Sequence, residues 1–237
     1  MSEWKARRFW TASSINQTDE GWEVMLDTRR LMTPGKQPLI LPTRALAEAV
    51  ATEWDAQGDV IKPQEMPLTR AANSAVEKVA PQRAEVVAML ADYGGTDLLS
   101  YRATEPAELV ARQAAEWDPL LDWAEARLGA RLRVTAGVIP VAQDPEALAA
   151  LRARLAALDL FGLTAAHDLV TLPGSLVIGL GVIEGRLDAA EAHRLSRIDE
   201  DFQAERWGAD EEAQEAAEGR REAILSAARL WTLSRPS

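Results

Sequence analysis

The sequence contains no cysteine, which excludes disulfide bonds, thiolate nucleophiles and cysteine-bound metal sites. It has only two histidines, His167 and His193, and neither an HExxH nor an HxH pattern, so a zinc site would depend mainly on carboxylates. There is no Gly-Lys-Ser/Thr phosphate-binding loop, and Gly179, Gly181 and Gly185 do not have dinucleotide-loop spacing. We therefore expect neither a metal nor a cofactor.

Long apolar runs are also missing. The most apolar segment, residues 175–183, is too short to span a bilayer, and the first ten residues lack the apolar stretch of a signal peptide. The formal net charge is −11, which disfavours nucleic acid or an anionic membrane as the main partner, because both are polyanions. We expect a cytoplasmic protein with no integral membrane segment. A basic protein partner suits the charge, although solubility alone would also explain it.

The pattern of the 237 residues changes near residue 42. Residues 8–41 contain short β-type runs separated by turn signals, typical of a small antiparallel unit of roughly three to five strands. From Thr43, a suitable N-cap, apolar residues recur at helical spacing. The sequence thus predicts an α+β fold, in which a small antiparallel β-rich N-terminal domain (residues 1–60) precedes a larger α-helical C-terminal domain (residues 61–237).

Three features of the helical region carry specific expectations. Pro119 should kink or restart the long helix that follows Pro106. The apolar segment 175–184 fits either a buried strand or a buried helix; helix is favoured because its neighbours are helices. Gly179 and Gly181 would then permit close packing against another helix.

The segment 188–207 is predicted to form one amphipathic helix, with Asp188 as its N-cap and Gly208 as its end. Three consecutive acids, Asp199, Glu200 and Asp201, would lie late in that helix, where its dipole disfavours them. Either neighbouring arginines or a binding partner should compensate them. The competing interpretation is an ordinary solvated helix face.

Six segments in the same order resemble the ATP synthase assembly chaperone family of the Atp-twelve type. They cover nearly the whole chain, and although no single one is diagnostic, their joint match is specific. The matching segments are residues 21–34 (GWEVMLDTRRLMTP), 46–55 (LAEAVATEWD), 66–73 (MPLTRAAN), 96–102 (TDLLSYR), 116–125 (EWDPLLDWAE) and 195–208 (LSRIDEDFQAERWG).

The resemblance implies an α+β, non-enzymatic protein without a cofactor. Its implied role is to bind the unassembled α subunit of the ATP synthase catalytic head, to prevent its aggregation, and to be displaced by the β subunit. It also implies a functionally important acid at Asp199, with Glu200 adjacent, and a sensitive segment around Trp54. Because no organelle presequence precedes Trp4, we expect a bacterial member that is monomeric when free; relatives act in the mitochondrial matrix.

The expected partner-binding residues lie in the acidic helix, and the expected structural residues are tryptophans. The first set is Asp199, Glu200 and Asp201, with Arg197 and Arg206 orienting them; the second is Trp54, Trp117 and Trp123. Two alternatives remain open. One is a hydrolase or isomerase that uses the acidic helix 188–207 for acid–base chemistry, and the other is an acidic scaffold for a different partner.

Overall fold

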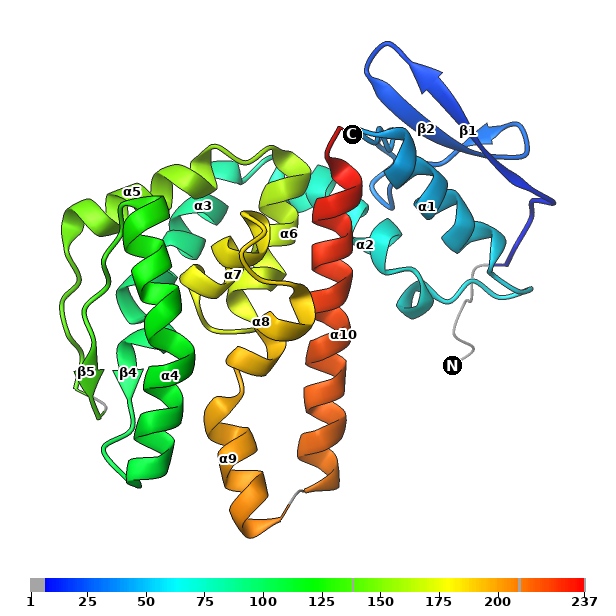
Figure 1. Ribbon diagram of the computed structural model, residues 1–237. Helices are drawn as coiled ribbons and strands as arrows, with labels where there is room; N and C mark the ends of the chain where they lie inside the picture. Colours follow the sequence, from blue (N-terminus) through cyan, green and yellow to red (C-terminus); the bar gives the residue numbers. More distant parts are fainter. Residues whose placement is uncertain (1–6, 138, 209, 237) are drawn as a thin grey trace. The chain divides into compact units, whose positions relative to one another are not determined.

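The computed structural model describes residues 7–137, 139–208 and 210–236, which group into two compact units (Figure 1). Unit 1 contains residues up to 83, together with 160–164 and the C-terminal residues from 229. Unit 2 contains residues 84–159 and 165–228. Residues 61–83, which the sequence assigned to the helical domain, are grouped with unit 1. The predicted division into domains of residues 1–60 and 61–237 stays a prediction, and residues 1–6 lie outside the described part.

Unit 1 begins with a three-stranded antiparallel sheet in the order β1-β2-β3. The strands are β1 (Ser13–Thr18), β2 (Gly21–Leu26) and β3 (Arg29–Arg30). Helix α1 (Arg44–Asp55) packs across β1 and β2 (Figure 1). Thr43 is the predicted N-cap, and its side chain accepts the N–H of Leu46 at 3.1 Å. The expected small antiparallel N-terminal sheet is confirmed.

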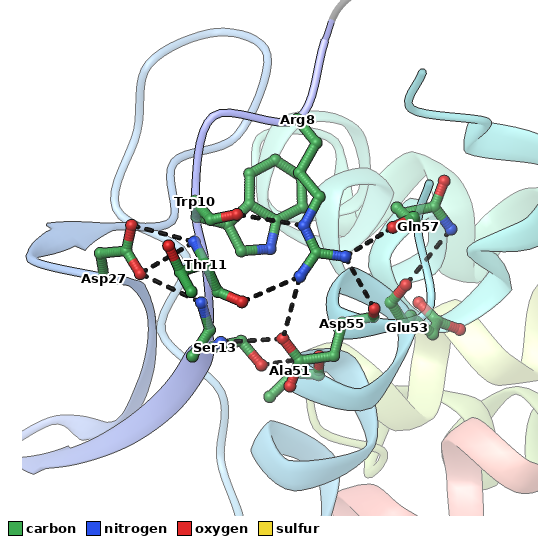
Figure 2. A network of polar contacts seen from close by, with 10 residues as sticks. Arg8, Trp10, Thr11, Ser13, Asp27, Ala51, Glu53, Asp55 and Gln57 are labelled. Carbon is green, nitrogen blue, oxygen red and sulfur yellow. Dashed lines mark hydrogen bonds and ion pairs between the residues drawn. The ribbon is translucent and has the colours of Figure 1, made fainter. Parts of the chain in front are cut away.

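The N-terminal strand segment is fastened to the end of α1 by Arg8. Its guanidinium donates to four backbone carbonyls, among them those of Asp55 at 2.9 Å and Gln57 at 2.6 Å (Figure 2). A cation at a helix C-terminus satisfies exposed carbonyls and suits the helix dipole. The Asp55 carboxylate in turn accepts the N–H of Ser13 at 2.8 Å, so the edge of the sheet and the end of α1 are held together.

Glu53 caps the start of the next helix, α2 (Pro67–Ser74). This helix continues into a π-helical turn at Ala75–Val79. The Glu53 carboxylate accepts the backbone N–H groups of Leu68 and Thr69, both at 2.8 Å, and the Thr69 hydroxyl at 2.7 Å. These are N–H groups that a helix start leaves without partners. A short 3-10 turn, Pro63–Glu65, connects the two helices.

Unit 2 is built mainly from helices. They are α3 (Arg83–Asp92), α4 (Ala107–Trp123), α5 (Pro145–Ala156), α6 (Leu160–Thr171), α7 (Leu176–Ile183), α8 (Ala189–Leu195), α9 (Ile198–Trp207) and α10 (Glu211–Ser234). The ends of α3, α6 and α10 are shared with unit 1. Unit 2 also contains two 3-10 turns, Tyr93–Thr96 and Leu98–Ser100, and a π-helical turn, Ala124–Leu128. Its two short strands, β4 (Tyr101–Arg102) and β5 (Thr135–Ala136), are parallel. The α+β fold is confirmed.

Helix α7 is the centre of unit 2, and all eight of its residues are buried. This confirms the helical interpretation of the apolar segment. The Ser175 hydroxyl accepts the N–H of Ile178, while the fully buried Asp97 accepts the Ser175 hydroxyl at 2.7 Å and the N–H of Val177 at 3.0 Å. In the part of the chain that the structure describes, no helix is both long and apolar enough to cross a membrane.

Of the two expectations for Pro119, a restart is excluded because α4 runs unbroken from Ala107 to Trp123, while a kink stays a prediction. A proline inside a helix crowds the carbonyl four residues earlier and leaves it without its N–H donor. Both Pro119 and Ala115 are exposed, so water can satisfy this carbonyl. The long helix therefore accommodates Pro119 on its solvent face.

Candidate functional site: the acidic helix and its recess

The acidic segment consists of two helices rather than one. The predicted helix 188–207 divides into α8 and α9, with Ser196 and Arg197 between them. Asp188 is the predicted N-cap of α8, and it accepts the N–H of Glu191 at 2.7 Å. At the break, the Leu195 carbonyl, which would accept the N–H of residue 199 in a continuous helix, accepts the indole N–H of Trp117 at 2.9 Å.

This division corrects the prediction about the three acids. Asp199, Glu200 and Asp201 occupy the first turn of α9 instead of lying late in a longer helix. A helix N-terminus stabilises negative charge by about 0.3–1 kcal/mol per group at exposed positions. The acids therefore fit their helix without help from a partner, and any binding role must be argued from what surrounds them.

Helix α9, whose buried residues are Ile198 and Phe202, lies against α4, and a row of polar contacts joins the two helices. The row joins residues spaced along one face of α4 to residues of α8 and α9. Its members are Glu116–Arg194 (two contacts of 2.9 Å), Gln113–Asp199 (2.5 Å), Arg112–Glu205 (2.9 Å to both carboxylate oxygens) and Glu108–Arg206. Hydrogen bonding from Arg194 also holds the pKa of the Glu116 carboxyl below its usual range.

Gln113 is the residue that sequence analysis missed. It is fully buried, its Oε1 accepts the N–H of Ala103 at 2.8 Å, and its Nε2 donates to Oδ1 of Asp199 at 2.5 Å. Because the backbone N–H of Ala103 needs an acceptor, the side-chain oxygen of Gln113 must face it, and this fixes the orientation of the Gln113 amide. The signal was a polar residue in the buried stripe of α4, four residues from both Leu109 and Trp117.

The five predicted partner-binding residues have different local partners. Arg197 pairs with Asp201 at 3.1 Å, as its spacing suggested. Arg206 contacts none of the three acids in the described contacts; it pairs with Glu108 of α4 and lies 4.9 Å from the Phe202 ring. Glu200 is exposed, and among the described residues it has neither an ion pair nor a hydrogen bond from its side chain.

The three tryptophans predicted to be structural also differ. Trp117 is 1% exposed and carries Arg102 over its ring at 5.3 Å. Trp54, in unit 1, packs edge-on against Trp10 with ring centroids 5.1 Å apart. Trp123 is half-buried at the end of α4. A tryptophan at a helix position is expected to lie in the core, but Trp207 is 78% exposed at the end of α9.

A recess of about 270 Å³ opens beside the first turn of α9, and all of its lining residues belong to unit 2. Its apolar wall contains the buried Trp117, Pro173 and Ile224. Charged residues on its lining come from the α8–α9 junction and from α10; they are Arg197, Asp199, Glu200 and Arg220. The acidic helix therefore borders a concave site with an apolar interior.

Ser196, His193 and Asp199 share this recess, but they are not arranged as a nucleophile, a base and an orienting acid. The Ser196 hydroxyl donates to the backbone carbonyl of His193 at 2.7 Å, and Nε2 of His193 faces the Ala217 carbonyl at 3.1 Å. A serine nucleophile needs its hydrogen bond to the imidazole itself. Burial, with Arg197 nearby, lowers the pKa of His193. The described residues also hold no cluster of three or more His, Asp or Glu side chains that could bind a metal ion.

The fold and the site together define a class: an α+β protein with a small β unit and a charged helical face beside a recess of side-chain size. Such a surface is suited to protein recognition. The chain belongs to the family of the ATP12 chaperone protein, whose model matches residues 7–125.

Individual relatives support this assignment. The crystal structure of Atp12 from Paracoccus denitrificans is 64% identical with a TM-score of 0.96, and the match covers 98% of this chain and 100% of that one. An aspartate-to-lysine mutant of the same protein matches equally well, at 64% identity and a TM-score of 0.96 over 99% and 100% of the two chains. The mitochondrial protein atp12 of Schizosaccharomyces pombe is 25% identical over 221 residues, 88% of this chain and 76% of its own.

Proposed function

We propose that this protein is an assembly chaperone for the catalytic head of the proton-translocating ATP synthase. It binds the unassembled α subunit, prevents its aggregation and is displaced when the β subunit takes the same surface. Membership in the ATP12 chaperone family carries this proposal. The physical need is that an unassembled subunit of an obligate oligomer exposes a large apolar interface that would otherwise aggregate.

We propose that α9 makes the contact. At about 100° per residue, Glu200 and Trp207 lie on the same side of α9, about two turns apart, and opposite its buried face, which contains Ile198 and Phe202. Exposed aromatic side chains are enriched in protein interfaces, and the Glu200 carboxylate, which has no counter-charge among the described residues, can meet a cationic group of the partner. Asp199 borders the same face, while Arg197 holds Asp201 and Arg206 fixes α9 to α4.

We further propose that the protein works without bond chemistry and without a cofactor. Release by competition requires no energy source, provided that the β subunit binds the shared surface more tightly. Because the Paracoccus relative is bacterial and the fission-yeast relative is named mitochondrial, we propose a bacterial, cytoplasmic protein that is monomeric when free. Its net charge of −11 would speed its encounter with a basic surface.

Light scattering tests the proposal directly. Isolated α subunit is warmed alone and with an equimolar amount of this protein, and we expect aggregation to be suppressed. Added β subunit should then release the chaperone, as measured by size-exclusion chromatography. Unchanged aggregation at equimolar ratio would contradict the chaperone role, whereas a stable three-way complex would contradict displacement. If the acidic surface serves another partner, capture from the native host would recover that partner instead of the α subunit.

A further inference from the structure

The recess beside α9 has the size of a site for one side chain. Its volume of about 270 Å³ lies below the roughly 300–1,000 Å³ that cofactor and drug-sized ligands occupy. Interfaces often derive most of their affinity from one anchor residue, usually Trp, Tyr or Arg, that fills a pocket of this kind. The charges of the lining decide among these three.

The lining combines an apolar interior with a charged rim. Trp117 and Ile224, each 1% exposed, form the inner wall, while Glu200 and Arg220 are exposed and stand at its opening. An occupant with a long apolar stem and a charged end satisfies both parts, because its stem can be buried while its charge stays near water. Of the three usual anchors, arginine has this form.

The balance of charges around the recess favours a cationic occupant. Arg197 is already committed to Asp201, and Asp199 is held by the neutral amide of Gln113, so its charge keeps no cationic partner within the described contacts. Glu200 has no ion pair among the residues that the structure describes. Arg220 is the one lining cation in the described set without an ion pair. The rim therefore presents two uncompensated carboxylates against one uncompensated guanidinium.

We propose that this recess binds a single arginine side chain of the protein partner, with the guanidinium between Asp199 and Glu200 and the stem against Trp117 and Ile224. Gln113 is a positioning residue: it occupies Oδ1 of Asp199 and leaves Oδ2 available for the guanidinium. A planar guanidinium is weakly hydrated and can donate to two carboxylates at once, which a lysine ammonium does less well. The inference rests on the proposed function for the identity of the partner, but not for the chemistry of the recess.

The first experiment uses the isolated α subunit and three matched variants, each removing one surface charge. Glu200→Gln should raise the Kd for the α subunit about 5–10-fold. Arg220→Gln should lower this Kd about 2–5-fold, because it removes a positive charge that would repel the arginine of the partner. Glu215→Gln, an exposed acid on α10 outside the recess, is the control and should leave the Kd unchanged. The opposite pattern, a weaker Arg220→Gln complex and an unaffected Glu200→Gln complex, would mean an acidic occupant and overturn the proposal.

The second experiment needs no partner protein. N-acetyl-arginine amide is titrated into the ¹⁵N-labelled full chain, with N-acetyl-norleucine amide as the uncharged control. We expect millimolar binding of the arginine probe, a realistic affinity for so small a ligand, with shifts centred on the Gln113 side-chain amide and the first turn of α9. These shifts should be reduced several-fold in Glu200→Gln. Equal shifts with norleucine amide, or none at these positions with arginine amide, would overturn the proposal.

The two experiments separate the two ideas. An arginine probe that binds while the α subunit does not would leave the recess in place and remove the proposed partner. An α subunit that binds with no sensitivity to either rim charge, together with a silent probe titration, would keep the chaperone function and remove the arginine site.

Discussion

The side-chain amide of Gln113 donates a hydrogen bond of 2.5 Å to the carboxylate of Asp199, 86 positions further along the chain. The same glutamine accepts the N–H of Ala103, so one buried residue of α4 fixes both the segment after β4 and the first turn of α9. The acid that the family resemblance singles out is thus held from inside unit 2. This geometry separates the fold-related part of its role from the charge-related part.

Replacing Gln113 tests how much its hydrogen bonds to Ala103 and Asp199 contribute to stability. Gln113→Leu has a similar volume but leaves the Ala103 N–H and the Asp199 carboxylate without their partner, so the free energy of unfolding should fall by about 1–3 kcal/mol. Gln113→Glu should also destabilise at pH 7.5, because it places a second carboxylate against Asp199, and should recover part of the loss at pH 5. Urea unfolding followed by circular dichroism measures both. A leucine variant as stable as the parent chain would show that this bond contributes little.

Replacing Asp199 tests the functional half. Asp199→Asn keeps an oxygen for the Gln113 amide, so we expect an unfolding free energy within about 1 kcal/mol of the parent and a loss of α-subunit protection in light scattering. Asp199→Lys should lose protection as well and be less stable by about 1–3 kcal/mol, since it leaves the buried Gln113 amide without its acceptor and places a cation at a helix N-terminus. Glu212→Gln, an exposed acid of α10, is the control. If the asparagine variant protects the α subunit fully, the negative charge of Asp199 is not needed for protection.

The sequence predicted features that depend on local chemistry and missed those that depend on distant contacts. The caps Thr43 and Asp188 were identifiable because a side-chain oxygen bonds a backbone N–H three residues away. The break between α8 and α9 was not, because Leu195, Ile198 and Phe202 satisfy the spacing of one helix equally well. At that break the Leu195 carbonyl accepts the indole N–H of Trp117, a contact with a residue 78 positions earlier in the chain.

The same distinction applies to the candidate site. Three neighbouring acids are visible in any sequence, but their position in a helix depends on where that helix begins. Arg197 pairs with Asp201 one turn away and could be predicted from spacing. Arg206 could not, since Glu108, its partner, precedes it by 98 positions. The recess combines residues of α4, α8, α9 and α10 with Leu98 and residues 171–174, and no local pattern indicates such an arrangement.

Glu53 supports a prediction about unit 1. Glu53→Ala removes acceptors from two N–H groups at the start of α2 and from the Thr69 hydroxyl, so we expect a loss of about 1–3 kcal/mol in unfolding free energy. Glu48→Ala is the matched control on the same helix, because its exposed pairing with Arg44 should contribute only about 0.3–0.5 kcal/mol. Thermal and urea unfolding would measure the difference. Equal losses in the two variants would refute the capping role.

Asp97 should make stability depend on pH in an unusual direction. Burial raises the pKa of its carboxyl from 3.8 to about 6, although the Ser175 hydroxyl and backbone N–H groups oppose the rise. The folded chain therefore binds this proton more tightly than the unfolded chain between pH 4 and 6. Its contribution to stability is present below pH 4 and is lost as pH rises through 6, by an amount on the order of 3 kcal/mol.

The comparison that isolates this effect is between the parent chain and Asp97→Asn, which cannot ionise. Other carboxyls titrate in both proteins, so only the difference between them is informative. We expect the advantage of the parent chain to grow as pH falls from 7 to 4, as measured by urea unfolding at each pH. A difference that stays constant across this range would show that folding does not change the pKa of Asp97.

Two helical glycines should respond oppositely to the same substitution. At Gly179 in α7, an added Cβ would lie 2.6 Å from Cγ2 of Val170 and 2.8 Å from the Leu169 carbonyl oxygen, so α6 and α7 would have to separate. We expect Gly179→Ala to lose about 1–3 kcal/mol, more than the roughly 1 kcal/mol that alanine gains in helix propensity. At Gly219 in α10 nothing lies within 4 Å, so Gly219→Ala should gain about 0.5–1 kcal/mol. Melting temperatures of both variants provide the measurement; a Gly179→Ala chain that melts no lower than the parent would show that α6 and α7 need no close approach there.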